Sequence, residues 1–367
     1  MLIQPDNKLL QYSGRIDWTD AKAPVFVYPC SSIKMKFRGT YVKAVVENRK
    51  NYWSSYLGFF IDGEQKCIRL ADRSREIITP TDSGKEIIAP ADSNQEIITL
   101  ADGLDNTEHE LMLFKRMDAC HTFTFYGFEV DDNAVLCEAV PKPGRRIEVY
   151  GDSVSAGEVS EAVDYAGQSD PEHDGEYSNS YYSYAWMAAR KLNAEIHDIA
   201  QGGVALLDGT GWFDGPDFVG MESIYDKIQY YPEPKYPSIW DFKLYRPHVV
   251  IVAIGQNDAN PEDYMAEDYE GEKAKRWRKS YRDFVANLRT IYPKAAIILS
   301  TTILEHDPSW DRAIDEVCRG LADERIHHFL YSNNGVGTPG HIRIPEAERM
   351  AEELTGFIES LGTEIWE

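Results

Sequence analysis

The chain of 367 residues is longer than one hydrophobic core usually supports, so the length predicts two domains. Acidic residues outnumber basic residues by 61 to 38, and a net charge of -23 argues against nucleic-acid phosphates and anionic membrane surfaces as partners. Residues 1–8 lack the basic start and long apolar run of a signal peptide, so we expect a cytoplasmic protein. The 5 cysteines are scattered without zinc-like spacing, and we expect neither disulfides, nor a metal site, nor a cofactor.

Short apolar or aromatic runs separated by turn signals occupy residues 1–140. Residues 32–37 alternate strictly between polar and apolar side chains, as a half-buried strand does. Residues 56–63 end in Asp-Gly, a strong hairpin signal. This spacing predicts an all-β sandwich of the jelly-roll type over residues 1–140. The other expected strands are 23–28, 41–46, 110–115 and 122–128.

A ten-residue repeat occupies residues 76–103, and its three copies begin at Glu76, Glu86 and Glu96. The repeat is too short and has too few copies for a solenoid. Prolines in the first two copies are typical of edge strands or loops, so we expect a duplicated strand and turn on the first domain. The repeat and the aromatic content of 12% make a homo-oligomer plausible.

Residues 141–146, Pro-Lys-Pro-Gly-Arg-Arg, indicate a short and stiff linker. From there on, apolar strands alternate with amphipathic helices, which predicts an α/β domain over residues 145–367. Its sheet should be parallel and covered by helices on both faces. The expected strands are 147–150, 195–200, 248–254, 295–300 and 327–331, and the expected helices are 180–192, 279–291, 310–322 and 345–360.

Four residues with useful chemistry follow strands of this predicted sheet. Ser153, Gly203 and Asn257 each come shortly after a strand, and His341 lies in a loop rich in Gly and Pro after the last strand. Because parallel strands end at the same edge of a sheet, we expect the four residues to meet there. Ser153 can act as a nucleophile and His341 as its base. The backbone N–H groups of Ser153 and Gly203 and the side-chain amide of Asn257 can form an oxyanion hole.

Each residue alone has an ordinary structural explanation, such as a helix cap for Ser153. Two other functions also stay open. A metal-dependent hydrolase using Asp152, Asp258 and His341 lacks the dense spacing of such sites and leaves Asn257 unexplained. A carbohydrate-binding protein without catalysis leaves Ser153 and His341 unexplained.

The blocks Gly-Asp-Ser at 151–153, Gly203, Gly-Gln-Asn-Asp at 255–258 and His341 resemble those of the SGNH (GDSL-like) hydrolases, over roughly residues 145–367. A jelly roll in front of such a domain resembles carbohydrate esterase family 2, which removes acetyl groups from xylan, mannan and simple sugars. Segments of the first domain that also resemble this family are 100–104, 108–111, 114–116 and 127–130.

This resemblance implies a three-layer α/β/α domain with a parallel sheet behind the jelly roll. It implies a serine esterase that removes O-acetyl groups from xylan-derived or other plant cell-wall saccharides through an acyl-enzyme intermediate. By analogy, Ser153 is the nucleophile, His341 is the base, and Gly203 and Asn257 are oxyanion donors, with Gly202 as the alternative to Gly203. Esters of other short acyl groups stay open as substrates, because no large apolar lid is evident.

One departure from the family pattern concerns the base. Most SGNH hydrolases carry an Asp a few residues before the His, whereas residues 336–340 here read Val-Gly-Thr-Pro-Gly. We therefore expect a Ser-His dyad, in which a backbone carbonyl of the 335–339 loop, supported by Thr338, orients His341 Nδ1. A carboxylate from elsewhere, such as the acid-rich 305–315 loop, is the alternative. Asp152 is expected to hold its loop and not to transfer a proton.

The segment 204–246 is rich in aromatic residues. Core packing is the commoner fate of such residues, and a cleft wall on which sugar rings stack is the sharper hypothesis. Under that hypothesis Trp212 and Trp240 bind the acetylated saccharide. The aromatic residues between the strands are Trp212, Phe213, Phe218, Tyr225, Tyr230, Tyr231, Tyr236 and Trp240.

Overall fold

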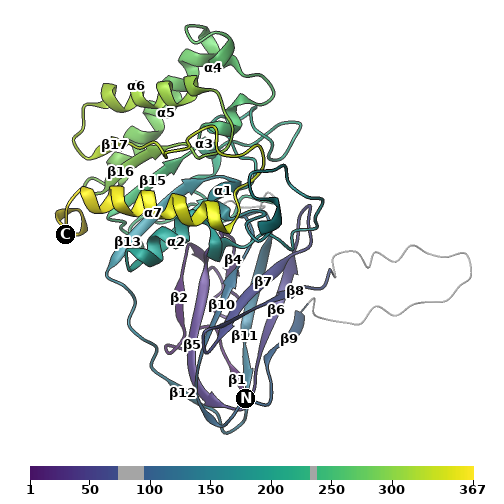
Figure 1. Cartoon of the computed structure of the whole chain (residues 1–367). Helices are drawn as coiled ribbons and strands as arrows, with labels where there is room; N and C mark the ends of the chain where they lie inside the picture. Colours follow the sequence, from purple (N-terminus) through teal and green to yellow (C-terminus); the bar gives the residue numbers. More distant parts are fainter. Residues whose placement is uncertain (73–94, 232–237) are drawn as a thin grey trace, which may run out of the picture.

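The computed structural model describes residues 1–72, 95–231 and 238–367. An all-β part forms the lower half of the molecule in Figure 1, and an α/β part forms the upper half. This arrangement confirms the predicted fold class, with an all-β sandwich in front of an α/β/α arrangement. The division of the chain into two domains stays a prediction. Among the described residues, no helix combines the length and the apolar character needed to cross a membrane.

Two antiparallel sheets share one core in the all-β part. In β5 (Ser32–Gly39), Ile33, Met35 and Phe37 are buried while Lys34 is exposed, as the alternating sequence predicts. One sheet has the order β3-β4-β11-β6-β9 with β1 beside β11, and the other has the order β12-β5-β10-β7-β8 with β2 beside β5. The remaining strands are β1 (Leu2–Ile3), β2 (Gln11–Ser13), β3 (Ile16–Asp17), β4 (Val25–Phe26), β6 (Val42–Arg49), β7 (Tyr56–Ile61), β8 (Glu64–Arg69), β9 (Gln95–Ala101), β10 (Thr107–Lys115), β11 (Thr122–Val130) and β12 (Val135–Cys137).

The ten-residue repeat is described only in its third copy. That copy lies in β9, which pairs with β6 at the edge of its sheet, so the strand expected there is confirmed. Residues 76–94, which hold nearly all of the first two copies, lie outside the described residues, and the expected hairpin stays a prediction.

Five parallel strands form the sheet of the α/β part, in the order β14-β13-β15-β16-β17. The central strand β15 (Val249–Ala253) is buried at every position, which explains its unbroken apolar sequence. Side chains that alternate along these strands belong to two different cores, one on each face of the sheet. The other strands are β13 (Arg145–Gly151), β14 (Ala194–Ala200), β16 (Ala296–Ser300) and β17 (Ile326–His328).

Helices cover both faces of this sheet. α2 (Tyr184–Lys191) and α7 (Ile344–Ser360) pack on one face, and α5 (Glu272–Ile291) and α6 (Pro308–Leu321) pack on the other (Figure 1). α5 begins seven residues earlier than predicted, because residues 272–278 are mostly strong helix formers. The shorter helical elements are α1 (Ser153–Ala156), η1 (Val163–Tyr165), η2 (Ser180–Tyr182), α3 (Met221–Ile224), η3 (Gln256–Ala259), α4 (Tyr264–Glu267) and η4 (Glu364–Trp366).

Two loops of the all-β part contact the α/β part. In the loop between β10 and β11, the backbone N–H of Ala119 donates a hydrogen bond to the carbonyl of Ala200, the last residue of β14, at 3.3 Å. In the loop between β6 and β7, the backbone N–H of Ser54 donates to Asp174 Oδ1 at 3.0 Å. The all-β part therefore reaches the carboxyl edge of the parallel sheet, where the candidate catalytic residues were expected.

Candidate active site

Ser153 is the first residue of α1, directly after the end of β13. Asp152 caps this helix, and its Oδ1 accepts a hydrogen bond from the backbone N–H of Val154 at 3.0 Å. A side chain at Gly151 would meet Ser155 Oγ at 2.1 Å, so the tight turn from strand to helix requires glycine. Ser153 is 5% exposed and reaches the surface through one cavity.

This cavity has a volume of about 540 Å³ and lies between the two parts of the molecule. It brings together all four residues that the sequence predicted, Ser153, Gly203, Asn257 and His341, and Gly202 lies beside them. The parallel strands β13, β14 and β15 deliver the first three, and the loop before α7 delivers His341. The other residues lining the cavity are Asn51, Tyr52, Trp53, Glu158, Asp170, Trp212, Phe213, Asp214, Tyr231, Leu304, Pro339 and Gly340.

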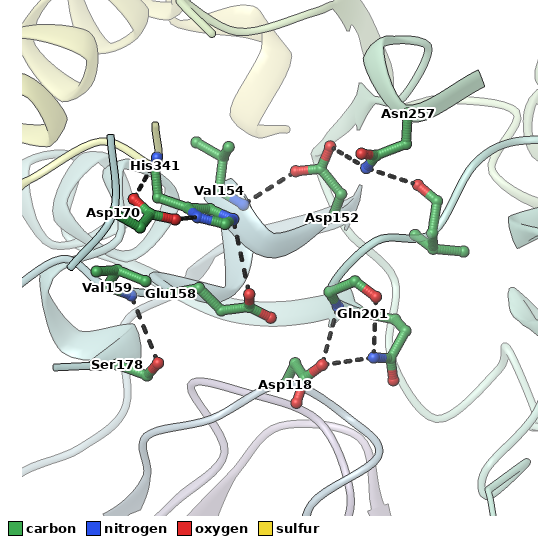
Figure 2. A network of polar contacts seen from close by, with 12 residues as sticks. Asp118, Asp152, Val154, Glu158, Val159, Asp170, Ser178, Gln201, Asn257 and His341 are labelled. Atoms are coloured by element: carbon green, nitrogen blue, oxygen red, sulfur yellow. Dashed lines mark hydrogen bonds and ion pairs between the residues drawn. The ribbon is translucent and has the colours of Figure 1, made fainter. Parts of the chain in front are cut away.

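A carboxylate orients His341, so the expected Ser-His dyad is wrong. His341 Nδ1 lies 2.5 Å from Asp170 Oδ2, and the backbone N–H of His341 donates to Asp170 Oδ1 at 2.9 Å (Figure 2). Burial raises the pKa of Asp170, but the hydrogen bonds from His341 and Arg343 outweigh it and hold this pKa well below its usual range. Asp170 is therefore an anion at neutral pH, and it can fix the imidazole tautomer and stabilise an imidazolium.

The loop that was expected to orient His341 makes other contacts. The carbonyl of Thr338 accepts a hydrogen bond from the backbone N–H of Glu305 at 3.0 Å, and Thr338 Oγ1 accepts one from Gly340 at 3.4 Å. In the acid-rich 305–315 loop, Asp311 Oδ2 pairs with His306 Nε2 at 3.1 Å. Neither the predicted carbonyl nor the alternative carboxylate source takes the place of Asp170.

Glu158 is a second carboxyl group beside His341 that the sequence analysis missed. It is 5% exposed, and its Oε2 lies 3.7 Å from His341 Nε2, on the side of the ring opposite Asp170 (Figure 2). Burial, followed by the nearby charges of Asp118 and Asp152, raises the pKa of Glu158 well above its usual value. His341 thus lies between Asp170, whose surroundings favour the anion, and Glu158, whose surroundings favour the protonated form.

Gly203, and not Gly202, is free to act as the oxyanion donor. The backbone N–H of Gly202 donates to Asp118 Oδ2 at 3.0 Å and is already engaged (Figure 2). Gly203 has φ of +72°, and a Cβ there would lie 2.8 Å from Trp212 Cβ, so this position requires glycine. The choice of Gly203 over Gly202 agrees with these contacts.

Asn257 lies at the cavity with its side-chain amide already hydrogen-bonded. Its Nδ2 donates to Asp152 Oδ2 at 3.1 Å and to the carbonyl of Val204 at 3.0 Å. An oxyanion would have to share or replace one of these two bonds. Asp152 also accepts from Gln256 Nε2, and burial raises the pKa of Asp152 to about 6. These contacts tie α1 to η3 and agree with the loop-holding role predicted for Asp152.

The two predicted substrate-binding tryptophans lie in different places. Trp212 is 66% exposed and lies at the cavity, together with Phe213 and Tyr231. Trp240 is 6% exposed, lies outside this cavity and packs 5.2 Å from the guanidinium of Arg15, which contradicts its predicted place on the cleft wall. Tyr236 lies outside the described residues.

Tyr52 and Trp53 line the cavity from the all-β part, and no sequence pattern predicted them. Their loop joins two ordinary antiparallel strands, so neither spacing nor periodicity distinguishes them from packing residues. Predicting that this loop lines the cavity would have required knowing which face of the sandwich meets the parallel sheet.

The alternative metal site is not assembled. Among the described residues, Asp152, Asp258 and His341 do not bring their ligand atoms close enough to share an ion. Asp258 is instead buried below the site, where burial raises its pKa to about 7. A different group has potential ligand atoms within 4.8 Å of one another, and it consists of Asp118, Cys120 and His121.

The all-β sandwich followed by an SGNH-type α/β/α sheet is the fold of the family 2 carbohydrate esterases, and the resemblance expected from the sequence is confirmed. Residues 12–89 match the family described as Carbohydrate esterase 2 N-terminal. A family two carbohydrate esterase from Cellvibrio japonicus superposes with a TM-score of 0.78 at 22% identity, covering 100% of this chain and 99% of that chain. Another from Clostridium thermocellum, in complex with cellohexaose, has a TM-score of 0.75 at 22% identity, covering 98% of this chain and 100% of that chain.

Two curated relatives carry related names. The cellulase/esterase CelE of Acetivibrio thermocellus is 27% identical over 367 residues, which covers 97% of this chain and 40% of CelE. The acetylxylan esterase / glucomannan deacetylase of Cellvibrio japonicus is 28% identical over 217 residues, which covers 58% of this chain and 56% of that protein. The chain thus spans about half the length of the curated relatives it matches.

Asp170 is testable without knowledge of the substrate. A sulfonyl fluoride that modifies nucleophilic serines should label Ser153 in the wild-type protein, and Asp170→Asn should slow this labelling by about 10²- to 10⁴-fold, because the base loses its tautomer and orientation. Mass spectrometry of the intact protein measures the rate. Glu172→Gln, which neutralises an exposed carboxylate two residues away in the same loop, is the control and should label at the wild-type rate. An unchanged labelling rate in Asp170→Asn would support a Ser-His dyad without Asp170.

Proposed function

We propose that the protein is a carbohydrate O-acetyl esterase, a carboxylic ester hydrolase that removes acetyl groups from saccharides by way of Ser153. The observation that carries the proposal is the contact of 2.5 Å between His341 Nδ1 and Asp170 Oδ2 in the cavity that also contains Ser153. A nucleophile, a base and a group that orients the base are the parts that acyl transfer needs. A purely binding protein has no use for this arrangement.

In the first half of the proposed reaction, Ser153 Oγ attacks the acetyl carbonyl carbon while His341 Nε2 accepts the hydroxyl proton. The negative charge that develops on the carbonyl oxygen is stabilised by the N–H groups of Ser153 and Gly203, with Asn257 as third donor. Asp170 stabilises the imidazolium. When the tetrahedral intermediate collapses, His341 returns the proton to the departing sugar oxygen, and the acetyl group stays on Ser153.

In the second half, a water molecule takes the place of the sugar. His341 accepts a proton from this water as it attacks the acetyl-serine carbonyl, and the same oxyanion donors act again. Collapse releases acetate and returns the proton to Ser153 Oγ. Glu158 retains its own proton in this scheme, because a second anion near Nε2 would hold the imidazolium in place and hinder proton return.

Several features support an acetylated, uncharged saccharide as the substrate. The exposed ring of Trp212 is part of the cavity lining, where a sugar ring can stack. The net charge of -23 repels anionic polymers, so a neutral saccharide fits better. The name of one relative includes acetylxylan and glucomannan, which supports the proposal of xylan-derived or other plant cell-wall saccharides as substrates. A cytoplasmic location and a homo-oligomeric state stay predictions from the sequence.

The reaction itself is tested by acetate release from acetylated xylan, acetylated xylo-oligosaccharides, acetylated monosaccharides and an aryl acetate. The wild-type protein should release acetate, and Ser153→Ala should reduce kcat to background, because no other hydroxyl replaces the nucleophile. Ser155→Ala, which removes a hydroxyl from the same helix, should retain activity. Activity in Ser153→Ala that is lost on adding EDTA would support the metal-dependent alternative, and no acetate from any substrate would support a binding protein.

Trp212 provides a separate test of the saccharide. Trp212→Ala should raise KM for acetylated xylo-oligosaccharides by about 10-fold, which corresponds to a loss of about 1.4 kcal/mol of binding free energy. KM for a small aryl acetate should change less than twofold. Trp18→Ala removes a tryptophan that is 41% exposed and lies away from the cavity, and it serves as the control. Equal changes in KM for both substrates would contradict stacking.

A further inference from the structure

Asp118 is a buried carboxylate of the all-β part that contacts residues 201–203 of the α/β part, which we call the oxyanion loop. It belongs to the loop between β10 and β11 and is 1% exposed. Its Oδ2 accepts hydrogen bonds from the backbone N–H of Gly202 at 3.0 Å and from Gln201 Nε2 (Figure 2). Tyr52 donates its hydroxyl to the same oxygen at 2.8 Å. Asp118 does not itself line the catalytic cavity.

The surroundings of Asp118 keep it ionised. Burial raises its pKa, but the hydrogen bond from His121 Nδ1 at 2.7 Å, the positive charge of Lys115 and the Tyr52 hydroxyl outweigh burial, so the pKa lies well below its usual range. Lys115 is buried beside it and donates to the carbonyls of Met117 and Asp118, and burial lowers the pKa of Lys115 to about 8. Both oxygens of Asp118 are thus occupied by protein donors, and the group needs no ion to satisfy them.

The segment that Asp118 holds is one that would otherwise be free to move. β14 ends at Ala200, and residues 202 and 203 are both glycine, the residue with the largest backbone freedom. Gly203 must have φ of +72° to present its N–H at the cavity. Hydrogen bonds to Gln201 and Gly202 fix the two residues immediately before it, and Tyr230 completes the support by donating to Gln201 Oε1 at 2.8 Å.

We propose that Asp118 is a positioning residue of the catalytic centre, and that its carboxylate fixes residues 201–202 so that the N–H of Gly203 points at the developing oxyanion. This inference rests on the proposed function for its catalytic consequence. It assigns the all-β part a role inside the active site, in place of a separable carbohydrate-binding role. Preorganised donors act because they are held in place before charge develops, and a misplacement of about 1 Å costs about 10²-fold in rate.

The test compares Asp118→Asn with Asp174→Asn in the full chain. Asp118→Asn keeps the size of the side chain but removes the negative charge that its hydrogen-bond donors Gln201, Gly202, Tyr52 and His121 share. Asp174 also joins the two parts, by accepting from the N–H and the hydroxyl of Ser54 at 3.0 and 2.6 Å, but it does not contact residues 201–203. Both variants remove hydrogen bonds across the junction, from a carboxylate that is 1% exposed in Asp118 and from one that is 55% exposed in Asp174, and only the first touches residues 201–203.

Asp118→Asn should lower kcat for an aryl acetate by about 10²-fold with KM within about twofold. The Ki of phenylboronic acid, which forms a tetrahedral adduct with serine, should rise by a similar factor. Active-site titration with a phosphonate corrects kcat for any misfolded fraction, and a merely structural loss would leave Ki unchanged. Asp174→Asn should change neither kcat per active site nor Ki. Wild-type kcat and Ki in Asp118→Asn would overturn the proposal.

Hydrogen exchange followed by mass spectrometry tests the same inference without any catalysis. The peptide that covers residues 200–204 should exchange at least about 10-fold faster in Asp118→Asn than in the wild type, and not in Asp174→Asn, because the Gly202 N–H exchanges its charged acceptor for a weaker, neutral amide oxygen. Unchanged exchange would overturn the role of Asp118 whatever the activity. An inactive wild type with the expected exchange would overturn the esterase function alone.

Discussion

The register of the parallel sheet determines where this protein does its chemistry. Gly151 of β13 pairs with Ala200 of β14 on one side and with Ala253 of β15 on the other, so the three strands end at the same level. The segments that follow these strands therefore emerge at one edge of the sheet. They supply the hydroxyl of Ser153, the backbone N–H of Gly203 and the carboxamide of Asn257. The cavity forms at that edge because glycines at 151 and 203 allow tight turns that larger residues would block.

Three carboxyl groups at or near the active site, those of Asp118, Glu158 and Asp170, have pKa values shifted in different directions by their surroundings. Asp170 and Asp118 accept several hydrogen bonds each, which lowers their pKa values, whereas Glu158 is buried without comparable donors and its pKa is raised. One anion at Nδ1 stabilises the imidazolium, and the raised pKa of Glu158 disfavours a second anion near Nε2. The protein therefore concentrates acidic residues at its active site without surrounding the base with negative charge.

The sequence predicted the features that depend on local periodicity. The alternation in β5 indicates an antiparallel sheet with one buried face, and the apolar run of β15 indicates a buried parallel sheet. The ends of the predicted parallel strands indicate Ser153, Gly203 and Asn257 as candidate site residues. Asp170 could not be predicted in this way, because it reaches His341 from an irregular loop far upstream that has no fixed spacing to it. The prediction that Trp240 lies on the cleft wall was wrong because it rested on composition alone. Aromatic content shows that large rings are present, but not that this ring stacks on Arg15 at the junction. Asp118, Tyr52 and Trp53 depend on how the two parts meet, which no local pattern encodes.

A crystal structure of the protein inactivated by a small phosphonate would test the roles of Ser153, Gly203 and His341 together, because the adduct resembles the tetrahedral intermediate. We expect phosphorus bonded to Ser153 Oγ, a phosphonyl oxygen within hydrogen-bond distance of the Gly203 N–H and Asn257 Nδ2, and His341 Nδ1 still paired with Asp170. A phosphonyl oxygen bound to the Gly202 N–H, or a His341 that has left Asp170 for a backbone carbonyl, would contradict these roles.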